Sequence, residues 1–356
     1  MRPERAGGNE RDQVQAGRGN CRRLHTDSGF RGACIAGRGR FFQSVGASGV
    51  DRSAGFECLV RRHLTEAPAH GIFKSTDQGQ TWFTINDGLP DLDVTTIAMD
   101  PLNSDTLYTG VDGGIFKSIN GGDSWSPTAP SVVYNIHDIA IDPLDSNTIF
   151  AGGDGTRSYS KSTDGGITWS SSSGIGHPYS FAIDPRDSQT LYAGVFRGVV
   201  GGAVYKSIDG GDHWFVANQG LPEAWVSTVV IDHQNSNIVY AGTAGYGLYK
   251  STDGAAQWKL SLTGTHLYVI CLVMDPRDSN TLYAGTSADA PGYPKRLFKT
   301  TDGGDTWNEA DSGIVAQTWT YSLAIDPQDS NIVYAGTNRG IFESIDAGDS
   351  WFAIGL

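Results

Sequence analysis

The chain has 356 residues, of which 38% are hydrophobic, 47 are glycine and 9 are tryptophan, and its formal net charge is −13. This acidic balance argues against a general nucleic-acid binder, because phosphate binding needs lysine and arginine on the contact face. No apolar run approaches the roughly 18–20 residues that span a membrane. The composition suits an all-β protein with many tight turns, and we expect no nucleic-acid partner and no membrane span.

Residues 1–70 differ in composition from the rest of the chain. They hold 12 arginines, no lysine and 7 acidic residues, whereas the remainder holds 14 basic and 32 acidic residues. No hydrophobic period of 2 or 3.6 is sustained here, and we find no apolar core of the kind that a secretory signal needs. We interpret this segment as disordered or as an artefactual extension, with a functional basic arm as the third alternative. Two short pieces, Phe41–Val45 and Phe56–Val60, could still be recruited as strands.

An eight-residue pattern, Ser/Thr-x-Asp-x-Gly-x-x-Trp, recurs from residue 71 onward, and we call it the box. Its seven copies are Ser75–Trp82, Ser118–Trp125, Ser162–Trp169, Ser207–Trp214, Ser251–Trp258, Thr300–Trp307 and Ser344–Trp351. Successive box tryptophans are 43, 44, 45, 44, 49 and 44 residues apart. A period of about 40–50 residues with several short strands per unit indicates a β-propeller.

Each repeat contains four β-rich runs, which we name A to D from the inside of a blade outward. In the last repeat these runs are Thr320–Pro327, Asn331–Gly336, Gly340–Ser344 and Ser350–Ile354. Six complete units follow residue 93, while the first box belongs to a half unit with runs C and D only. The sequence therefore predicts an all-β propeller over residues 71–356. We expect four-stranded antiparallel blades, six complete and one incomplete, in a ring of seven positions.

The box is expected to form the hairpin between strands C and D. Its carboxylate can accept backbone N–H bonds in its own turn, and glycine supplies the positive φ of the bend. We interpret the box acids as structural, because calcium needs about six to eight oxygens and a catalytic site needs different residues that converge once. These residues are Asp77, Asn120, Asp164, Asp209, Asp253, Asp302 and Asp346. Ala255 stands where glycine is usual, which predicts a strained or reshaped turn, whereas Ala347 is taken to fill a free position.

The pattern closely resembles the Asp-box, or BNR repeat, of sialidases, sortilin-type receptors, two-propeller xyloglucanases and the photosystem II assembly-factor group. The resemblance covers about residues 71–356 and implies a propeller whose boxes lie at the blade periphery, away from the active face. Enzymes and non-enzymes share the box, so the resemblance implies no single activity. We assign neither a metal nor a cofactor. The resemblance also implies export, although no signal peptide is visible, and the localisation stays open.

The strand order places the D–A and B–C loops on one face, opposite the boxes, and we call this side the loop face. Candidate binding residues there are Tyr134, Tyr179, Trp225, Tyr268, Trp319, Arg157, Arg197, Arg296 and Arg339. Aromatic rings beside carboxylates can stack on sugars. The resemblance to sialidases implies three converging arginines for a substrate carboxylate, and the four arginines lie in loops where such a group could be met.

No catalytic set can be assigned from the sequence. The candidate carboxylates are Asp138, Glu223, Glu309 and Asp311. Asp138 is foremost, because the other five complete repeats have uncharged residues at its position at the start of run A. The first hypothesis is a non-catalytic propeller that binds a protein or glycan partner through its loop face. The alternative is a glycoside hydrolase, xyloglucanase-like or sialidase-like, or a fragment of one.

Overall fold

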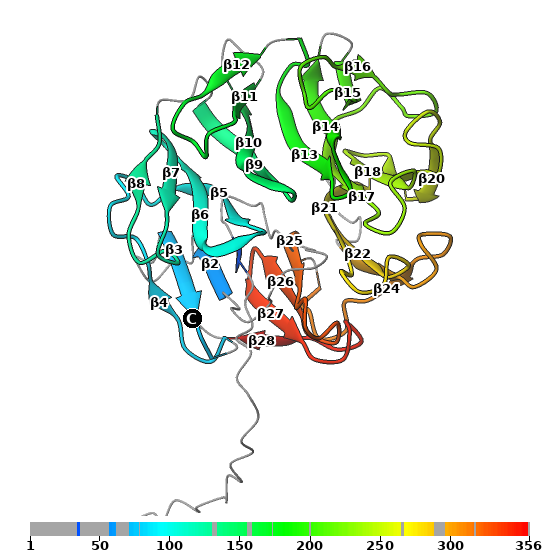
Figure 1. The fold of residues 1–356 in the computed structure, drawn as a ribbon. Helices are drawn as coiled ribbons and strands as arrows, with labels where there is room; N and C mark the ends of the chain where they lie inside the picture. The colour runs from blue at the N-terminus through cyan, green and yellow to red at the C-terminus, as the bar shows by residue number, and fades with distance from the viewer. Residues whose placement is uncertain are drawn as a thin grey trace, which may run out of the picture.

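The computed structural model describes residues 71–77, 79–129, 134–154, 159–172, 174–198, 201–264, 267–287, 296–316 and 318–354, together with the backbone of 34–35 and 57–61. Seven four-stranded sheets stand around a central axis as the blades of a propeller (Figure 1). Within each of blades 2–7 the strand order runs A to D in sequence, and all pairings are antiparallel. The predicted all-β fold is confirmed.

Blades 1 to 4 come from the first half of the chain. Blade 1 consists of β1 (Cys34–Ile35), β2 (Glu57–Arg61), β3 (Gly71–Ser75) and β4 (Phe83–Thr84). Blade 2 consists of β5 (Val94–Asp100), β6 (Asn103–Val111), β7 (Gly114–Ser118) and β8 (Ser126–Pro127). Blade 3 consists of β9 (Tyr134–Asp142), β10 (Asp145–Asp154), β11 (Tyr159–Ser162) and β12 (Ser170–Ser172). Blade 4 consists of β13 (Pro178–Asp184), β14 (Asp187–Gly198), β15 (Gly201–Ser207) and β16 (Phe215–Val216).

Blades 5 to 7 complete the ring. Blade 5 consists of β17 (Val226–Ile231), β18 (Val239–Thr243), β19 (Gly247–Ser251) and β20 (Lys259–Leu262). Blade 6 consists of β21 (Tyr268–Met274), β22 (Leu282–Ser287), β23 (Leu297–Thr300) and β24 (Asn308–Glu309). Blade 7 consists of β25 (Thr320–Ile325), β26 (Val333–Thr337), β27 (Gly340–Ser344) and β28 (Phe352–Ile354).

Blade 1 is the partial blade that the half repeat predicts. Its strand A, β1, has two residues and pairs parallel with β2, whereas every other neighbouring pair in the ring is antiparallel. β1 contacts the inner strands β5 and β25, which places it between blades 2 and 7. The expectation that Phe56–Val60 could be recruited is confirmed in β2, while Phe41–Val45 lies outside the described residues. The interpretation of residues 1–70 as a separate segment stays a prediction.

Neighbouring blades pack through the buried ends of strand B. Strand B ends on the sequence Tyr-x-Gly or Phe-x-Gly. The aromatic residues of five copies, Tyr108, Phe150, Tyr192, Tyr240 and Tyr283, lie in the core and are almost fully buried. The glycine that follows lets the next blade approach, since a Cβ on Gly110 would lie only 2.7 Å from the Cβ of Ile136 in blade 3. The repeated motif therefore specifies contacts between blades as well as a strand end.

Each box forms a closed turn whose hydrogen bonds satisfy its own polar groups. In the box of blade 3, Ser162 Oγ donates to Asp164 Oδ1 (2.8 Å) and accepts the N–H of Gly166 (2.9 Å). The Asp164 carboxylate also accepts the backbone N–H and the hydroxyl of Thr168, at 2.8 and 2.6 Å. Asn120 makes the same bonds in blade 2, where its Oδ1 accepts and its Nδ2 donates to Ser124.

The two alanines of the boxes both adopt positive φ, 67° at Ala255 and 58° at Ala347. Ala255 occupies the second glycine position of its box, so the strained turn expected there is present. The expectation that Ala347 fills a free position is wrong. It occupies the first glycine position, where Gly165 has φ of 68°, so that position also requires the left-handed region.

Box tryptophans of blades 2, 5 and 7 join their blade to the one before it. The indole N–H groups of Trp125, Trp258 and Trp351 donate to the backbone carbonyls of Ile85, Ala217 and Ala310, at 2.7, 2.8 and 2.7 Å. Each acceptor lies at or just after the outer strand of the preceding blade. These bonds therefore link neighbouring blades at the rim of the ring.

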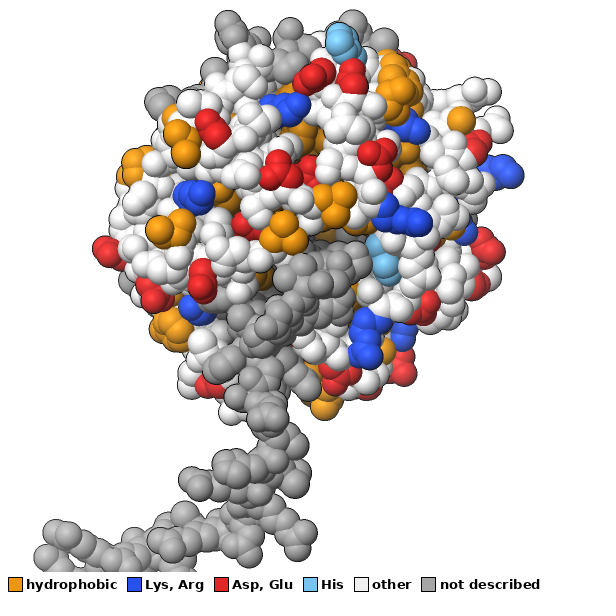
Figure 2. Space-filling model, in the orientation of Figure 1, with side chains coloured by type: hydrophobic (Ala, Val, Ile, Leu, Met, Phe, Trp, Pro, Cys, Tyr) orange, Lys and Arg blue, Asp and Glu red, His pale blue; other side chains and the backbone are white. Residues whose placement is uncertain are grey.

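On the face shown in Figure 2, acidic and basic side chains are interspersed over the described residues, and no large patch of one charge is seen.

Candidate functional site

The loop face carries the exposed tyrosine and tryptophan side chains of the described residues. They are Tyr134, Trp225, Tyr246 and Trp319, with exposed fractions between 36% and 64%. Each lies at the entry to a strand A or in a B–C loop. In the described part of the chain, the exposed phenylalanines lie in the outer strands at the rim: Phe83, Phe215 and Phe352. Three of the four exposed rings are residues singled out from the sequence, and Tyr246 is an addition to the candidate binding set.

Trp225 stands at the end of an aromatic row that crosses blades 3 to 5. Its ring meets Phe196 edge-on with ring centroids 3.9 Å apart, and Phe196 lies 5.4 Å from Tyr179. Tyr179 stacks on His137 with centroids 4.0 Å apart. The Trp225 carbonyl accepts the backbone N–H of Ala244 (2.9 Å). The indole of Trp225 is therefore partly exposed, and its position is fixed by ring packing on one side and by a backbone hydrogen bond.

Trp319 is held at the entry to blade 7 by the B–C loop of the same blade. Its backbone N–H donates to Asn338 Oδ1 (2.8 Å), and its carbonyl accepts the N–H of Asn338 (3.2 Å). Its ring meets Tyr321 edge-on with centroids 5.8 Å apart. Two exposed indoles, from blades 5 and 7, are thus fixed on the loop face by local bonds.

A polar cluster lies beside the aromatic row. The Asp154 carboxylate accepts Asn135 Nδ2 (2.9 Å) and lies 3.2 Å from His137 Nε2 and 3.4 Å from His177 Nδ1. The His177 contact is close enough for attraction but lacks hydrogen-bond geometry. Burial raises the pKa of the Asp154 carboxyl, but the bonds from Asn135 and His137 and the attraction of both imidazoles outweigh it and hold that pKa below its ordinary value.

The sequence pattern did not predict that His137, His177 and Asp154 meet. Asn135 adopts φ of 49°, and the pairing of β9 with β10 slips between Gly152 and Asp154. These two irregularities bring the D–A and B–C ends of blade 3 together. Among the described residues, no group of three or more His, Cys, Asp or Glu side chains is arranged to hold a metal ion.

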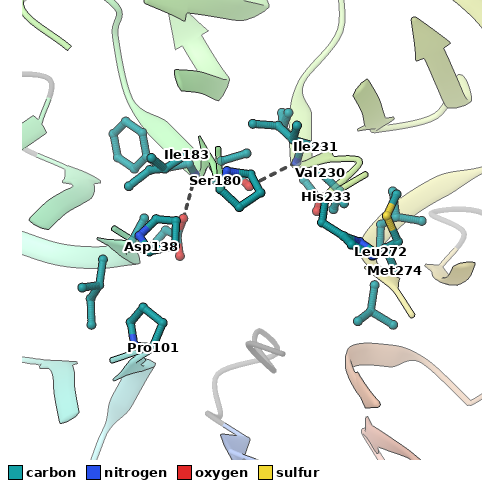
Figure 3. Close-up of a pocket in the computed structure, with 18 of the residues that line it drawn as sticks. Pro101, Asp138, Ser180, Ile183, Val230, Ile231, His233, Leu272 and Met274 are labelled. Atoms are coloured by element: carbon teal, nitrogen blue, oxygen red, sulfur yellow. Dashed lines mark hydrogen bonds between the residues drawn. The ribbon is translucent and has the colours of Figure 1, made fainter. Parts of the chain in front are cut away.

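Two of the four candidate carboxylates share one arginine, and the other two lie in separate places. Glu309 Oε2 and Asp311 Oδ2 lie 2.6 and 3.5 Å from the same nitrogen, Nη1 of Arg296. Glu223 is exposed in the D–A loop before blade 5 and borders Gly201. Asp138 lines the central channel, where its Oδ2 accepts the backbone N–H of Phe181 in the next blade (2.7 Å; Figure 3).

The remaining candidate residues divide into three groups. Arg157 and the side chain of Arg197 lie outside the described residues. Arg339 is exposed in the B–C loop of blade 7, and its backbone N–H donates to Thr337 Oγ1 (3.1 Å). Tyr268 is half-buried at the start of β21, beside Gly245. Only two of the four candidate arginine side chains, Arg296 and Arg339, belong to the described residues, so the three-arginine site stays a prediction.

Comparison with known proteins places the chain among propellers of this type. Residues 202–340 match the model of the Sortilin-Vps10 family, described as sortilin, neurotensin receptor 3. A search of curated proteins returned no match. The described residues include no helix long and apolar enough to cross a membrane.

Solved structures with a similar fold include enzymes as well as a protein bound to a peptide. The GH74 xyloglucanase from Xanthomonas campestris is 18% identical with a TM-score of 0.65, over 91% of this chain and 54% of that one. An ancestral GH74 enzyme is 23% identical with a TM-score of 0.62, over 81% of this chain and 40% of that one. YCF48 bound to D1 peptide is 16% identical with a TM-score of 0.56, over 77% of this chain and 84% of that one.

At these identities the comparisons show a similar fold and nothing more. The chain covers 54% of the Xanthomonas campestris enzyme and 40% of the ancestral GH74 enzyme. The seven boxes, the ring of four-stranded blades and the similarity to GH74 and YCF48 propellers agree with one another. The chain is a β-propeller with seven Asp-box, or BNR-type, repeats; it resembles the sortilin, GH74 and YCF48 propellers and is not assigned to any one of these families.

Proposed function

We propose that the chain is a non-catalytic binding module that holds a protein or glycan partner on its loop face. The observation that carries this proposal is the position of the exposed tyrosine and tryptophan rings. All exposed Tyr and Trp side chains of the described residues lie on that face. Tyr and Trp offer a large amphipathic contact area at little conformational cost, and they dominate the energetic hot spots of interfaces.

The state of the carboxylates supports binding over catalysis. Glycoside cleavage needs one carboxylic acid and one carboxylate, about 5–10 Å apart across the scissile bond. Here Glu309 and Asp311 share a guanidinium, and Asp138 bonds to backbone in the channel. These contacts engage three of the four candidate carboxylates in the structure itself, which supports binding over catalysis.

The test begins with glycan and peptide arrays probed with the full chain, and the dissociation constant of each ligand is then measured by calorimetry. Trp225→Ala and Trp319→Ala remove the two fixed indoles of the loop face. Phe215→Ala and Phe352→Ala are matched controls at the rim, and Phe215 and Trp225 are equally exposed at 47%. We expect at least one indole variant to weaken binding roughly 30-fold, the scale of an interface hot spot. Binding that survives both indole losses, or that depends on the rim residues instead, would refute the proposal.

A glycoside hydrolase is the second candidate, favoured by the likeness to GH74 folds and by the pairing of Glu309 with Asp311 around one arginine. Its test is release of reducing ends from xyloglucan and release of sialic acid from sialyl-lactose. Binding alone predicts no release from either substrate. Release that disappears in Glu309→Gln or Asp311→Asn would replace the binding proposal with the hydrolase.

A further inference from the structure

A lysine in strand C of blades 1 to 6 joins each of these blades to the box of the next blade. Its ammonium donates to a backbone carbonyl or to an aspartate of that box, at distances from 2.6 to 3.2 Å. A bond from a charged donor is stronger than a neutral one, so this lysine is a main link between blades. The lysines are Lys74, Lys117, Lys161, Lys206, Lys250 and Lys299.

The box tryptophan makes a second link at the same six junctions. In blades 2, 5 and 7 the indole N–H donates to a carbonyl of the preceding blade. In blades 3, 4 and 6 the indoles of Trp169, Trp214 and Trp307 donate to hydroxyls of the preceding blade, at 3.2, 2.9 and 3.0 Å. In the described part of the chain, six junctions therefore combine a charged bond with an indole bond.

The junction between blades 7 and 1, which we call the seam, has neither link among the described residues. Glu343 stands at the lysine position of blade 7, opposite Tyr334 in strand B. In the box of blade 1, Gln80 stands where four other boxes carry an aspartate that lies near this lysine. The indole N–H of Trp82 donates inside its own box, to the carbonyl of Gly79 (3.0 Å). Blades 7 and 1 stand side by side in Figure 1, so the ring closes here without these two bonds.

Apolar packing across the seam is also limited. Among the described residues, its cluster has two buried side chains, Phe73 and Ile341, with Trp82 and Ile354 packed against them. The cluster that joins blades 1 and 2 has eight buried side chains. Because hydrophobic stabilisation follows the apolar area removed from water, the seam gains less from packing than that junction does.

The Glu343 carboxyl adds a titratable group to the seam. Burial raises its pKa, and a hydrogen bond with Tyr334 opposes that rise. Its neighbour across the ladder in β28 is uncharged. By repeat position, Asp326 and Asp77 correspond to the two aspartates whose charges act on Lys206. Aspartates at these positions attract an ammonium and cannot attract a carboxylate.

We propose that the ring opens and recloses at the seam while the other six junctions stay closed, and that the ionised Glu343 carboxylate favours the open form. Burial gives this carboxyl a higher pKa in the closed ring than in an open one, where its pKa is ordinary. Closure is therefore strongest below the ordinary pKa of about 4.3 and weakens as the pH rises through the raised pKa. This device is independent of the loop-face proposal, because it rests on other residues at the rim.

The reaction of a buried thiol measures opening at one junction. Ile341→Cys lies at the seam, and Ile115→Cys lies at the same strand C position where blades 2 and 3 pack; both isoleucines are buried. In one chain that carries both substitutions, global unfolding exposes both thiols equally, whereas opening of the seam exposes the first alone. A dithiopyridine reagent modifies the thiols, and peptide mass mapping separates them from the four native cysteines. We expect the seam thiol to react about ten- to hundredfold faster at neutral pH, the scale of one or two missing bonds. Equal rates would overturn the proposal.

Substitutions of the links test the role of Glu343. Glu343→Lys with Gln80→Asp supplies the pair found between other blades and should slow the seam thiol about tenfold or more. Glu343→Gln removes the charge; it should slow the seam thiol at neutral pH and much less at about pH 4, where the closed ring holds Glu343 protonated. Lys299→Glu, read with Leu297→Cys, brings the chemistry of the seam to blades 6 and 7 and should speed that thiol about tenfold. A seam rate that neither Glu343→Lys with Gln80→Asp nor Glu343→Gln changes at neutral pH would overturn the role of Glu343.

Discussion

Substitution of Ala255 by glycine should stabilise the propeller. Ala255 occupies the second glycine position of its box with φ of 67°, whereas Gly166, Gly211 and Gly304 occupy that position with φ of 86°. The distortion has a consequence in the neighbouring blade. The hydroxyls of Tyr108, Tyr240 and Tyr283 donate to the carbonyl before the second glycine position of the next box, at 2.9, 2.7 and 2.5 Å. The equivalent hydroxyl of Tyr192 is buried and has no hydrogen-bond partner among the described residues.

Three terms determine the size of the effect. Relief of the left-handed conformation of an alanine contributes about 1–2 kcal/mol, and a bond from Tyr192 to the Gly254 carbonyl contributes about 1 kcal/mol. The greater freedom of glycine in the unfolded chain opposes these gains by roughly 0.5–1 kcal/mol. The net gain in the free energy of unfolding is about 1–2 kcal/mol, and the melting temperature should rise by about 2–4 °C for each kcal/mol.

Urea and thermal unfolding of matched variants test the reasoning. Ala347→Gly relieves the same kind of strain, but Tyr283 already bonds to the Ala347 carbonyl, so this variant should gain less than Ala255→Gly. Gly166→Ala imposes the strain on an intact box, where a Cβ would lie 3.2 Å from Thr128 Cγ2, and should destabilise the fold. A glycine at 255 that lowers stability, or that gains no more than Ala347→Gly, would refute the link between the alanine and the unpaired hydroxyl.

Two further predictions concern the same rim. Tyr283→Phe should cost about 1 kcal/mol in the free energy of unfolding because it removes a buried bond, whereas Tyr192→Phe should be neutral or slightly stabilising; equal losses on urea unfolding would contradict this. Hydrogen bonds from Ser350 and Ser344 lower the pKa of Asp346 to about 2, so its contribution to stability is present above its unfolded pKa of about 3.9 and is lost as the pH falls towards 2. Asp346→Asn should therefore reduce the fall of the urea midpoint between pH 4 and 2, and an unchanged fall would contradict the assignment.

The repeats allowed the fold to be predicted because each blade is specified locally. The box, the Asp-Pro pair that follows strand A in five of the six complete repeats and the Tyr-x-Gly or Phe-x-Gly end of strand B recur together, so one unit predicts the next. The sequence also predicted that the first blade is incomplete, since no A and B runs of the repeat pattern precede the first box. The parallel pairing of β1 with β2 was not, because it joins segments that share no repeat with the other blades.

The location of the loop face could be predicted from the sequence, but the contacts between its side chains could not. Strand order assigned Tyr134, Trp225 and Trp319 to it, and their exposure agrees. The meeting of His137, His177 and Asp154 depends on a left-handed Asn135 and a slipped pairing, which no periodicity encodes. Ala347 was misjudged for a related reason, because a glycine at the first box position looks free until its φ is known.

The most direct test of the loop-face account is a hydrogen-exchange footprint of the full chain with a ligand recovered from the arrays. The account predicts slower exchange in the loops that precede β17 and β25, which carry Trp225 and Trp319, and unchanged exchange in the boxes on the opposite face. Slower exchange confined to the boxes or to the outer strands, with no change in those two loops, would contradict it.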